Sequence, residues 1–270
     1  MGIPENYGNF DFMNCGDFPT GGWAEPLPPE FTEGKSVVTT ENYRKIRECG
    51  FDFVCSIYAL FPRDKELVLK HLSAAGENGV KVYVSDATVR AKELDVAAAK
   101  EGYEILKKKK GFGGYLVKDE PGSNEFAAIK VKDAAMKENL AGAGRYYNLL
   151  PTYSTGFMLK NGYWSNEAPI LQCDINEYNE YVRSFIETVK PEFLSYDFYP
   201  FAADGSFLPD YFVQLSIAAR NAALYGIPFM PFVQVCKFNT SSRKPTAEEI
   251  KWQINTQIAY GAKGMQFFTL

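Results

Sequence analysis

The stretch GFGGYLVKDEPGSNEF, Gly111–Phe126, places an apolar run directly before two adjacent carboxylates. Its segment Gly114–Asp119 carries the aromatic and β-branched residues that favour a strand. Pro121 and Gly122 then turn the chain. The stretch therefore predicts a strand whose carboxyl end is polar and whose connection turns away at once.

Short strand-like runs and amphipathic helical patterns alternate along the whole chain. Such alternation indicates parallel strands joined by crossover helices. Eight strands within 270 residues predict a (β/α)8 TIM barrel in a single domain of residues 1–270. A doubly wound open sheet is disfavoured because NCGDFPTGGW, Asn14–Trp23, lacks the glycine spacing of a dinucleotide site. The predicted strands are Asn9–Asn14, Phe51–Ile57, Val80–Ser85, Gly114–Asp119, Tyr146–Thr152, Phe193–Tyr199, Pro228–Val235 and Gly264–Thr269.

The helical patterns carry start and stop signals. Asp174 is placed to cap a helix, and Pro191 stops its apolar periodicity. Thr246 and Glu249 have capping-box spacing. The buried positions expected in these two helices are Tyr178, Tyr181, Val182, Phe185, Ile186 and Val189 in the first and Ile250, Ile254 and Ile258 in the second. No helical pattern follows strand eight, so the expected barrel ends there, without its final helix in this chain.

Composition excludes several classes of function. The net charge is -4 and the basic residues are dispersed, so no nucleic-acid partner is expected. The one dense basic run, Lys107–Lys110, ends a helical pattern, where cations suit the helix dipole. No apolar stretch reaches the ~20 residues of a membrane span. The first residues lack the features of a signal peptide, and a mature exported chain has the same appearance, so localisation stays open.

Cysteine and histidine usage argues against a metal or cofactor. The five cysteines are widely spaced without a CxxC pair, so neither a zinc site nor a disulfide framework is expected and most are interpreted as core residues. His71 is the only histidine and lies in a helical pattern, where a structural residue at the surface or partly buried is expected. Hydrolytic chemistry in this chain therefore depends on carboxylates.

Polar residues gather at the predicted strand ends. The active site of a (β/α)8 barrel lies at the carboxyl ends of its strands. Several such ends carry carboxylates, amides or tyrosines, which predicts one site. These residues are Asp86, Asp119, Glu120, Tyr153, Asp197, Tyr199 and Gln234.

Two long βα loops add aromatic side chains. The first, Cys15–Lys35, contains Trp23, and the second, Ser154–Gln172, contains Trp164. Long loops in compact domains are commonly functional or disordered. Exposed rings there stack on the apolar faces of sugars or on other planar ligands. The alternative is that these rings fold back and pack over the barrel.

Four segments carry a resemblance to a known family. They are GGYLVKDEPG (113–122), FLSYDFYPF (193–201), PFVQV (231–235) and RKPTAEEIKWQINTQIAYGAKGMQFFT (243–269). Together they resemble the barrel domain of clan A glycoside hydrolases, in particular bacterial barrels related to β-galactosidase-type enzymes. The first half of the chain agrees only in its strand–helix rhythm.

The resemblance implies roles for particular residues. Clan A enzymes carry an acid/base glutamate at the tip of strand four, which matches Glu120, and a nucleophilic glutamate at the tip of strand seven. This chain has Gln234 at the second position, and an amide cannot act as that nucleophile. Asp197 is the preferred second carboxylate, as nucleophile or as a base that activates water. The separation of the carboxyls distinguishes the two, at ~5 Å for retention and ~6.5–9.5 Å for inversion.

The sequence thus predicts a hydrolase of O-glycosidic bonds in an oligo- or polysaccharide, with Glu120 and Asp197 as catalytic residues. Carbohydrate is the only partner expected, and neither the sugar nor the oligomeric state is set by the sequence. One alternative is a carbohydrate-binding barrel without catalysis. Another is a Schiff-base aldolase or lyase that uses Lys118. The expected substrate-binding residues are Asp119, Gln234, Tyr199, Tyr153, Asp86, Trp23 and Trp164.

Overall fold

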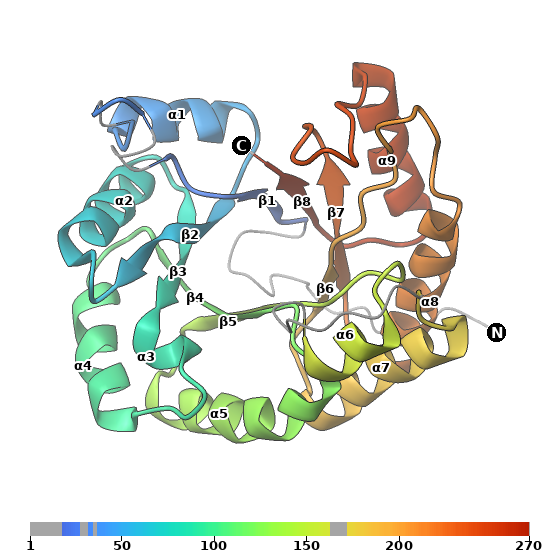
Figure 1. The fold of residues 1–270 in the computed structure, drawn as a ribbon. Coiled ribbons are helices and arrows are strands. Elements are labelled where there is room, and N and C mark those ends of the chain that lie inside the picture. The colour runs from blue at the N-terminus through green and yellow to red at the C-terminus, as the bar shows by residue number, and fades with distance from the viewer. Residues whose placement is uncertain (1–17, 28–31, 35–36, 163–171, 270) are drawn as a thin grey trace. The chain divides into compact units, whose positions relative to one another are not determined.

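The computed structural model of the chain describes residues 18–27, 32–34, 37–162 and 172–269. Strands and helices alternate along it (Figure 1). The strands are β1 (Thr20–Trp23), β2 (Phe53–Phe61), β3 (Lys81–Asp86), β4 (Phe112–Asp119), β5 (Gly144–Asn148), β6 (Leu194–Tyr196), β7 (Phe229–Gln234) and β8 (Met265–Phe268). The helices are α1 (Thr40–Glu48), α2 (Lys65–Glu77), α3 (Ala87–Arg90), α4 (Val96–Leu106), the 3-10 turn η2 (Ser123–Glu125), α5 (Phe126–Asn139), α6 (Gly156–Asn161), α7 (Ile175–Val189), α8 (Asp210–Tyr225) and α9 (Ala247–Ala259).

The predicted fold class is confirmed: the eight strands and their helices form the (β/α)8 barrel fold. The chain divides into two compact units. We call the unit built from Met13–Lys118 and Val131–Tyr146 the amino-terminal unit. The unit built from Asp119–Lys130 and Tyr147–Phe268 is the carboxyl-terminal unit.

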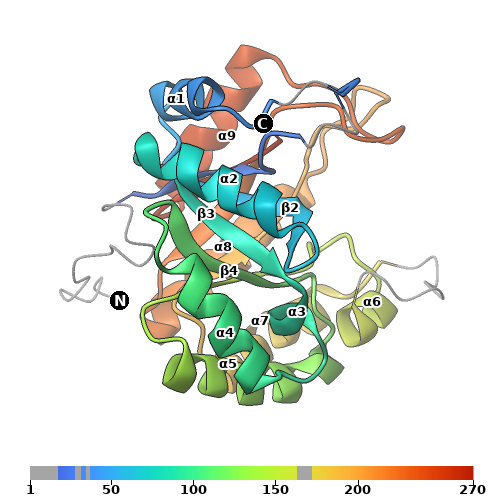
Figure 2. The same ribbon diagram turned by 90° about the vertical axis from the view of Figure 1, so that its left-hand side faces the viewer.

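The amino-terminal unit is a parallel sheet with helices on one face. β1, β2, β3 and β4 pair in that order, all parallel. Figure 2 shows α2 and α4 lying across this sheet. Its core is aromatic, with the Phe53 and Tyr83 rings 5.6 Å apart and the Tyr83 and Tyr146 rings 5.8 Å apart. Gly21 is required here, because a Cβ at that position lies 2.0 Å from the Phe53 ring.

The carboxyl-terminal unit repeats this construction. β6, β7 and β8 pair in parallel. α7 begins as predicted, with the Asp174 carboxylate accepting from the Asn176 backbone N–H at 2.7 Å. All six side chains predicted to be buried in α7 are buried. α8 ends at Gly226 in the left-handed conformation that glycine tolerates.

Helix α9 departs from the prediction. Its capping box between Thr246 and Glu249 is confirmed. Its expected isoleucine stripe is wrong, because Ile258 is 50% exposed and the buried side chains are Gln253 and Gln257. The Gln253 amide exchanges two hydrogen bonds with the Gln234 backbone, at 2.9 and 3.0 Å. Polar residues face the sheet here because they satisfy the main chain at the end of β7.

Two further expectations need correction near the chain start. The predicted strand Asn9–Asn14 lies outside the described residues. The structure places a strand, β1, at Thr20–Trp23, inside the segment predicted as a long loop. Trp23 is therefore a buried strand residue that packs 6.4 Å from the Tyr146 ring, not an exposed loop aromatic.

The second predicted loop is partly helical, since α6 occupies Gly156–Asn161. The cysteines are less buried than expected. Among the described residues Cys55 is buried, Cys49 is exposed, and Cys173 and Cys236 are partly buried. His71 has the expected structural role, but it is fully buried rather than partly buried or at the surface, with Nδ1 2.8 Å from the Tyr43 hydroxyl.

Candidate active site

The tip of β4 presents two carboxylates from a constrained backbone. β4 ends at Asp119, and Glu120 follows with φ 46, a left-handed conformation that is strained for a glutamate. The Glu120 N–H donates to the Asn148 carbonyl at 2.8 Å. The next carbonyl, of Pro121, accepts from the Tyr181 hydroxyl at 2.7 Å. These hydrogen bonds to the main chain at Glu120 and Pro121 hold the backbone of Glu120 in its strained conformation.

The tip of β6 supplies a third carboxylate. β6 ends at Tyr196, so Asp197 lies just beyond the strand, where it is buried. Asn148, the last residue of β5, donates through Nδ2 to Asp197 Oδ1 at 3.2 Å and to Asp119 Oδ1 at 3.1 Å. Ser195 Oγ donates to Asn148 Oδ1 at 3.1 Å. One amide thus connects the carboxylates of two strand tips, and a serine fixes its orientation.

The side chains of Glu120 and Asp197 also interact with each other. Burial raises the pKa of Glu120, and the negative charges of Asp197 and Asp119 raise it further. Burial and Asp119 likewise raise the pKa of Asp197, against the opposing hydrogen bonds from Asn148 and Tyr199. The pair can therefore hold a proton at neutral pH and deliver it to a bound ligand.

Two predicted tyrosines border a pocket beside these carboxylates. Tyr199 interacts with Asp197 and lowers the pKa of that carboxyl, and its ring lies 4.6 Å from that of Phe238. Tyr153 is 38% exposed and packs 4.9 Å from the Phe198 ring. Both tyrosines line a pocket of about 200 Å³. Tyr199 therefore belongs both to the lining of this pocket and to the surroundings of the Asp197 carboxyl.

Gln234 does not have the position expected of a sugar-binding amide. Its side chain is fully buried and satisfied by main-chain groups. Nε2 donates to the Arg243 carbonyl at 2.8 Å, and Oε1 accepts from the Phe201 N–H at 3.1 Å. The glutamine therefore fixes the loops that follow β6 and β7. The amide among the carboxylates is Asn148 instead.

The remaining predicted residues are Asp86, Trp23, Lys118 and Trp164. Asp86, at the end of β3 in the amino-terminal unit, caps α3 by accepting from the Thr88 N–H at 2.8 Å. Trp23 is buried in the same unit. Lys118 is a half-buried residue of β4. Trp164 lies outside the described residues. The substrate-binding roles of Asp86, Trp23 and Trp164 stay predictions.

Asn148 was not among the predicted residues. Its signal in the sequence was an amide within the largely apolar run Tyr146–Thr152. The prediction extended that strand to Thr152, whereas β5 ends at Asn148. The predicted end of this strand was therefore four residues too far along the chain, and Asn148 was not recognised as a residue of the strand tip.

The described residues contain no group of three or more His, Cys, Asp and Glu side chains arranged to hold a metal ion. Within the same residues, the helices are too short or too polar to cross a bilayer.

Comparison by sequence identifies no relative: no protein-family model matches the chain, and no curated protein matches it. Comparison of structures finds similar barrels. A proposed α-L-fucosidase from Bacteroides thetaiotaomicron has a TM-score of 0.63 and 11% identity over 95% of this chain and 89% of that chain. An endo-1,4-β-mannanase from Eisenia fetida has a TM-score of 0.51 and 10% identity over 94% and 85%.

The similar structures include another enzyme class. An HpcH/HpaI aldolase from Desulfitobacterium hafniense has a TM-score of 0.50 and 12% identity over 93% of this chain and 86% of that chain. At such identities the similarity establishes the fold alone. The chemistry must therefore be argued from the side chains of this chain.

Proposed function

We propose that this chain is a glycoside hydrolase in which Glu120 is the general acid and Asp197 the second carboxylate. The observation that carries the proposal is the cluster of carboxyls at the ends of β4 and β6, where Asn148 bonds to both Asp119 and Asp197 and the pKa values of Glu120 and Asp197 are both raised. A glycosidic oxygen leaves readily only when it is protonated. A carboxyl whose pKa is raised by burial holds a proton for that step at neutral pH. The fucosidase and mannanase folds named above are consistent with this assignment.

The proposed reaction has two steps. Bound sugar places its glycosidic oxygen beside the Glu120 carboxyl. Glu120 donates its proton to the leaving oxygen while the Asp197 carboxylate attacks the anomeric carbon and the glycosidic bond breaks. In the second step Glu120 takes a proton from water, the water oxygen bonds to the anomeric carbon, and the bond to Asp197 breaks.

We propose Asp197 as the nucleophile of a retaining reaction, with inversion through an activated water as the alternative outcome. Retaining enzymes hold their two carboxyls ~5–5.5 Å apart, and inverting enzymes hold theirs ~6.5–9.5 Å apart. An activated 2-deoxy-2-fluoro glycoside should accordingly label Asp197, and mass spectrometry of the digested protein locates the modified peptide.

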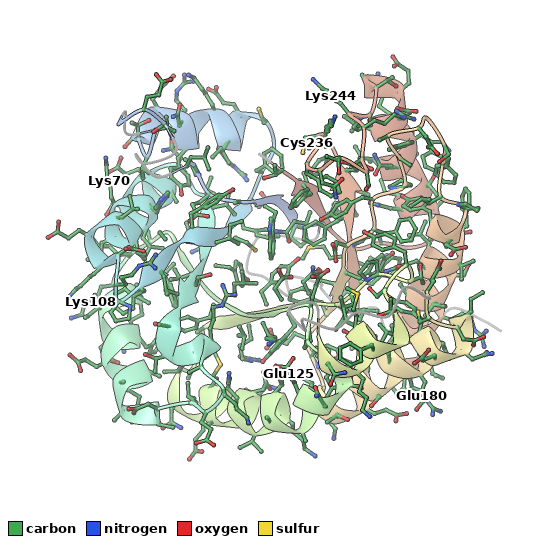
Figure 3. The ribbon with its side chains drawn as sticks, in the orientation of Figure 1. Lys70, Lys108, Glu125, Glu180, Cys236 and Lys244 are labelled. Atoms are coloured by element: carbon green, nitrogen blue, oxygen red, sulfur yellow. The ribbon has the colours of Figure 1, made fainter. Side chains whose placement is uncertain are left out.

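The first test is hydrolysis of a panel of aryl glycosides and oligosaccharides. Glu120→Gln should lower kcat at least ~100-fold, because positioned acid catalysis contributes about that much. Asp197→Asn should do the same. Glu180→Gln is the matched control, because Glu180 is an exposed residue of α7 that pairs with Arg183 (Figure 3). Unchanged kcat in Glu120→Gln contradicts the proposal.

A second candidate is a carbohydrate-binding barrel without catalysis. It is favoured by Gln234, whose amide occupies the place of the clan A nucleophile and is fully engaged with the main chain. Under this alternative, glycans bind wild type and Glu120→Gln equally and none is cleaved. The Schiff-base alternative is tested separately: borohydride with a carbonyl substrate should trap a lyase on Lys118 and leave a hydrolase unmodified.

A further inference from the structure

The pocket beside Asp197 is bordered by aromatic rings. Tyr153, Tyr199 and Phe238 line it, and the two residues Tyr153 and Phe238 are 38% and 37% exposed. Its volume of about 200 Å³ is below the ~300–1,000 Å³ typical of pockets for drug-sized ligands. A space of this size and lining fits one ring rather than a chain of rings.

The polar part of the pocket is rigid and uncharged. Ser242 Oγ accepts from the backbone N–H groups of Phe238 and Asn239 at 3.1 and 3.2 Å, which fixes the loop after β7. The Ser241 carbonyl accepts from the Ala203 N–H at 2.9 Å, which ties this loop to the one after β6. Asn239 uses Oδ1 on the Ser241 N–H, so its amide nitrogen can still donate to a ligand hydroxyl.

Charge restricts what this pocket can take. None of the described residues that line it carries a charge. Arg243 stacks over the Phe201 ring at 4.8 Å, but its guanidinium is paired with Glu249 at 2.6 and 2.8 Å. On the other side, Tyr199 contacts Asp197, one of three clustered carboxyls. An anionic ligand would meet these carboxyls without a lining cation to compensate.

From this arrangement we infer that the pocket is a subsite for a single uncharged sugar ring, stacked on Phe238 and Tyr153, and that sugars with a carboxylate are rejected. The inference rests on the proposed function, because it names the sugar class that the same site takes. The apolar face of a neutral pyranose fits the rings, and its hydroxyls can accept from Asn239. Selectivity arises from repulsion by the carboxyls as well as from attraction to the rings.

Calorimetric titration with matched sugars tests the inference. Methyl β-D-glucoside and methyl β-D-galactoside are compared with the corresponding uronides, which differ only at C6, on wild type and on Glu120→Gln. At least one neutral glycoside should bind about tenfold more tightly than its uronide. Phe238→Ala and Phe238→Leu should each weaken that binding about tenfold, the scale of one aromatic contact. Phe212→Ala is the matched control, since Phe212 is 39% exposed on α8 and does not line the pocket.

Equal affinity for each glycoside and its uronide, binding unchanged by both Phe238 variants, or no binding of any neutral glycoside would overturn the subsite. Circular dichroism establishes that the variants are folded. The hydrolase proposal fails independently. If the neutral sugar binds as described and no glycoside is cleaved, the subsite stands and the hydrolase does not. If glycosides are cleaved with a KM that Phe238→Ala leaves unchanged, the hydrolase stands and the subsite does not.

Discussion

Two features of Glu120 lower the stability of the folded protein, and a surface glutamate has neither of them. The Glu120 φ of 46 is strained for a residue with a Cβ, and its partly buried carboxyl lies near two aspartates that raise its pKa. Strain and a shifted pKa at one residue characterise functional sites, where stability is reduced in favour of chemistry. Measurements of protein stability should therefore detect a substitution of Glu120.

Glu120→Gln should stabilise the protein, and more so at pH 8 than at pH 5. An acid whose pKa rises on folding, from an ordinary 4.5, binds more protons folded than unfolded above that pH. Its contribution to stability therefore falls as pH rises towards the folded pKa. The glutamine has no such dependence, so we expect a gain of about 0.5–2 kcal/mol at pH 8. Thermal unfolding at both pH values measures it, with Glu180→Gln as control. An equal effect at both pH values would contradict the pKa direction.

Asn148 is expected to position the aspartates rather than to bind substrate. Asn148→Ala removes the bonds to Asp119 and Asp197, so kcat should fall about 100-fold, as misplaced catalytic groups do. Its bond lowers the pKa of Asp197, so the acid limb of the kcat profile should move to higher pH in the variant. Asn255→Ala, on the exposed side of α9, serves as control. A fall in kcat with an unmoved acid limb would argue against this role.

At the scale of elements, α9 shows how a helix can face a sheet with amides. A helix after a barrel strand usually buries an apolar stripe. In α9 the last carbonyls of β7 need donors, and Gln253 and Gln257 supply them. Isoleucine spacing in the sequence could not reveal this, because the periodicity of Gln253 and Gln257 matches a helix face equally well. The buried face of α9 is the one whose side chains can donate hydrogen bonds to the carbonyls of β7.

Gln253→Ala should lower the free energy of unfolding by about 1–3 kcal/mol, because it leaves the Gln234 N–H and carbonyl without partners in a buried position. Ile258→Ala should change it by less than about 0.5 kcal/mol, since Ile258 is half exposed. Urea unfolding of both variants measures the difference. A larger loss of stability in Ile258→Ala than in Gln253→Ala would support the buried isoleucine face expected from the sequence.

At the scale of the whole molecule, the proposed chemistry depends on carboxylates. The chain has a single histidine, and it is buried against Tyr43 with a pKa lowered to about 4 by burial. Because the proposed acid and nucleophile are the carboxyls of Glu120 and Asp197, dialysis against EDTA should leave hydrolysis unchanged. Activity lost on dialysis and restored by a divalent cation would contradict this view of the site.

The sequence by itself determined the strand–helix order, most strand positions and the carboxylates Glu120 and Asp197. These follow from local signals: β-rich runs, caps, and polar residues where strands end. The tertiary structure alone decided that the pKa values of Glu120 and Asp197 are raised, that Asn148 joins the strand tips, and that the Gln234 side chain bonds to the main chain. Those facts depend on contacts between residues tens of positions apart, which no local pattern encodes. Burial, which fixes both the pKa shifts and the inward face of α9, exists only once the chain has packed.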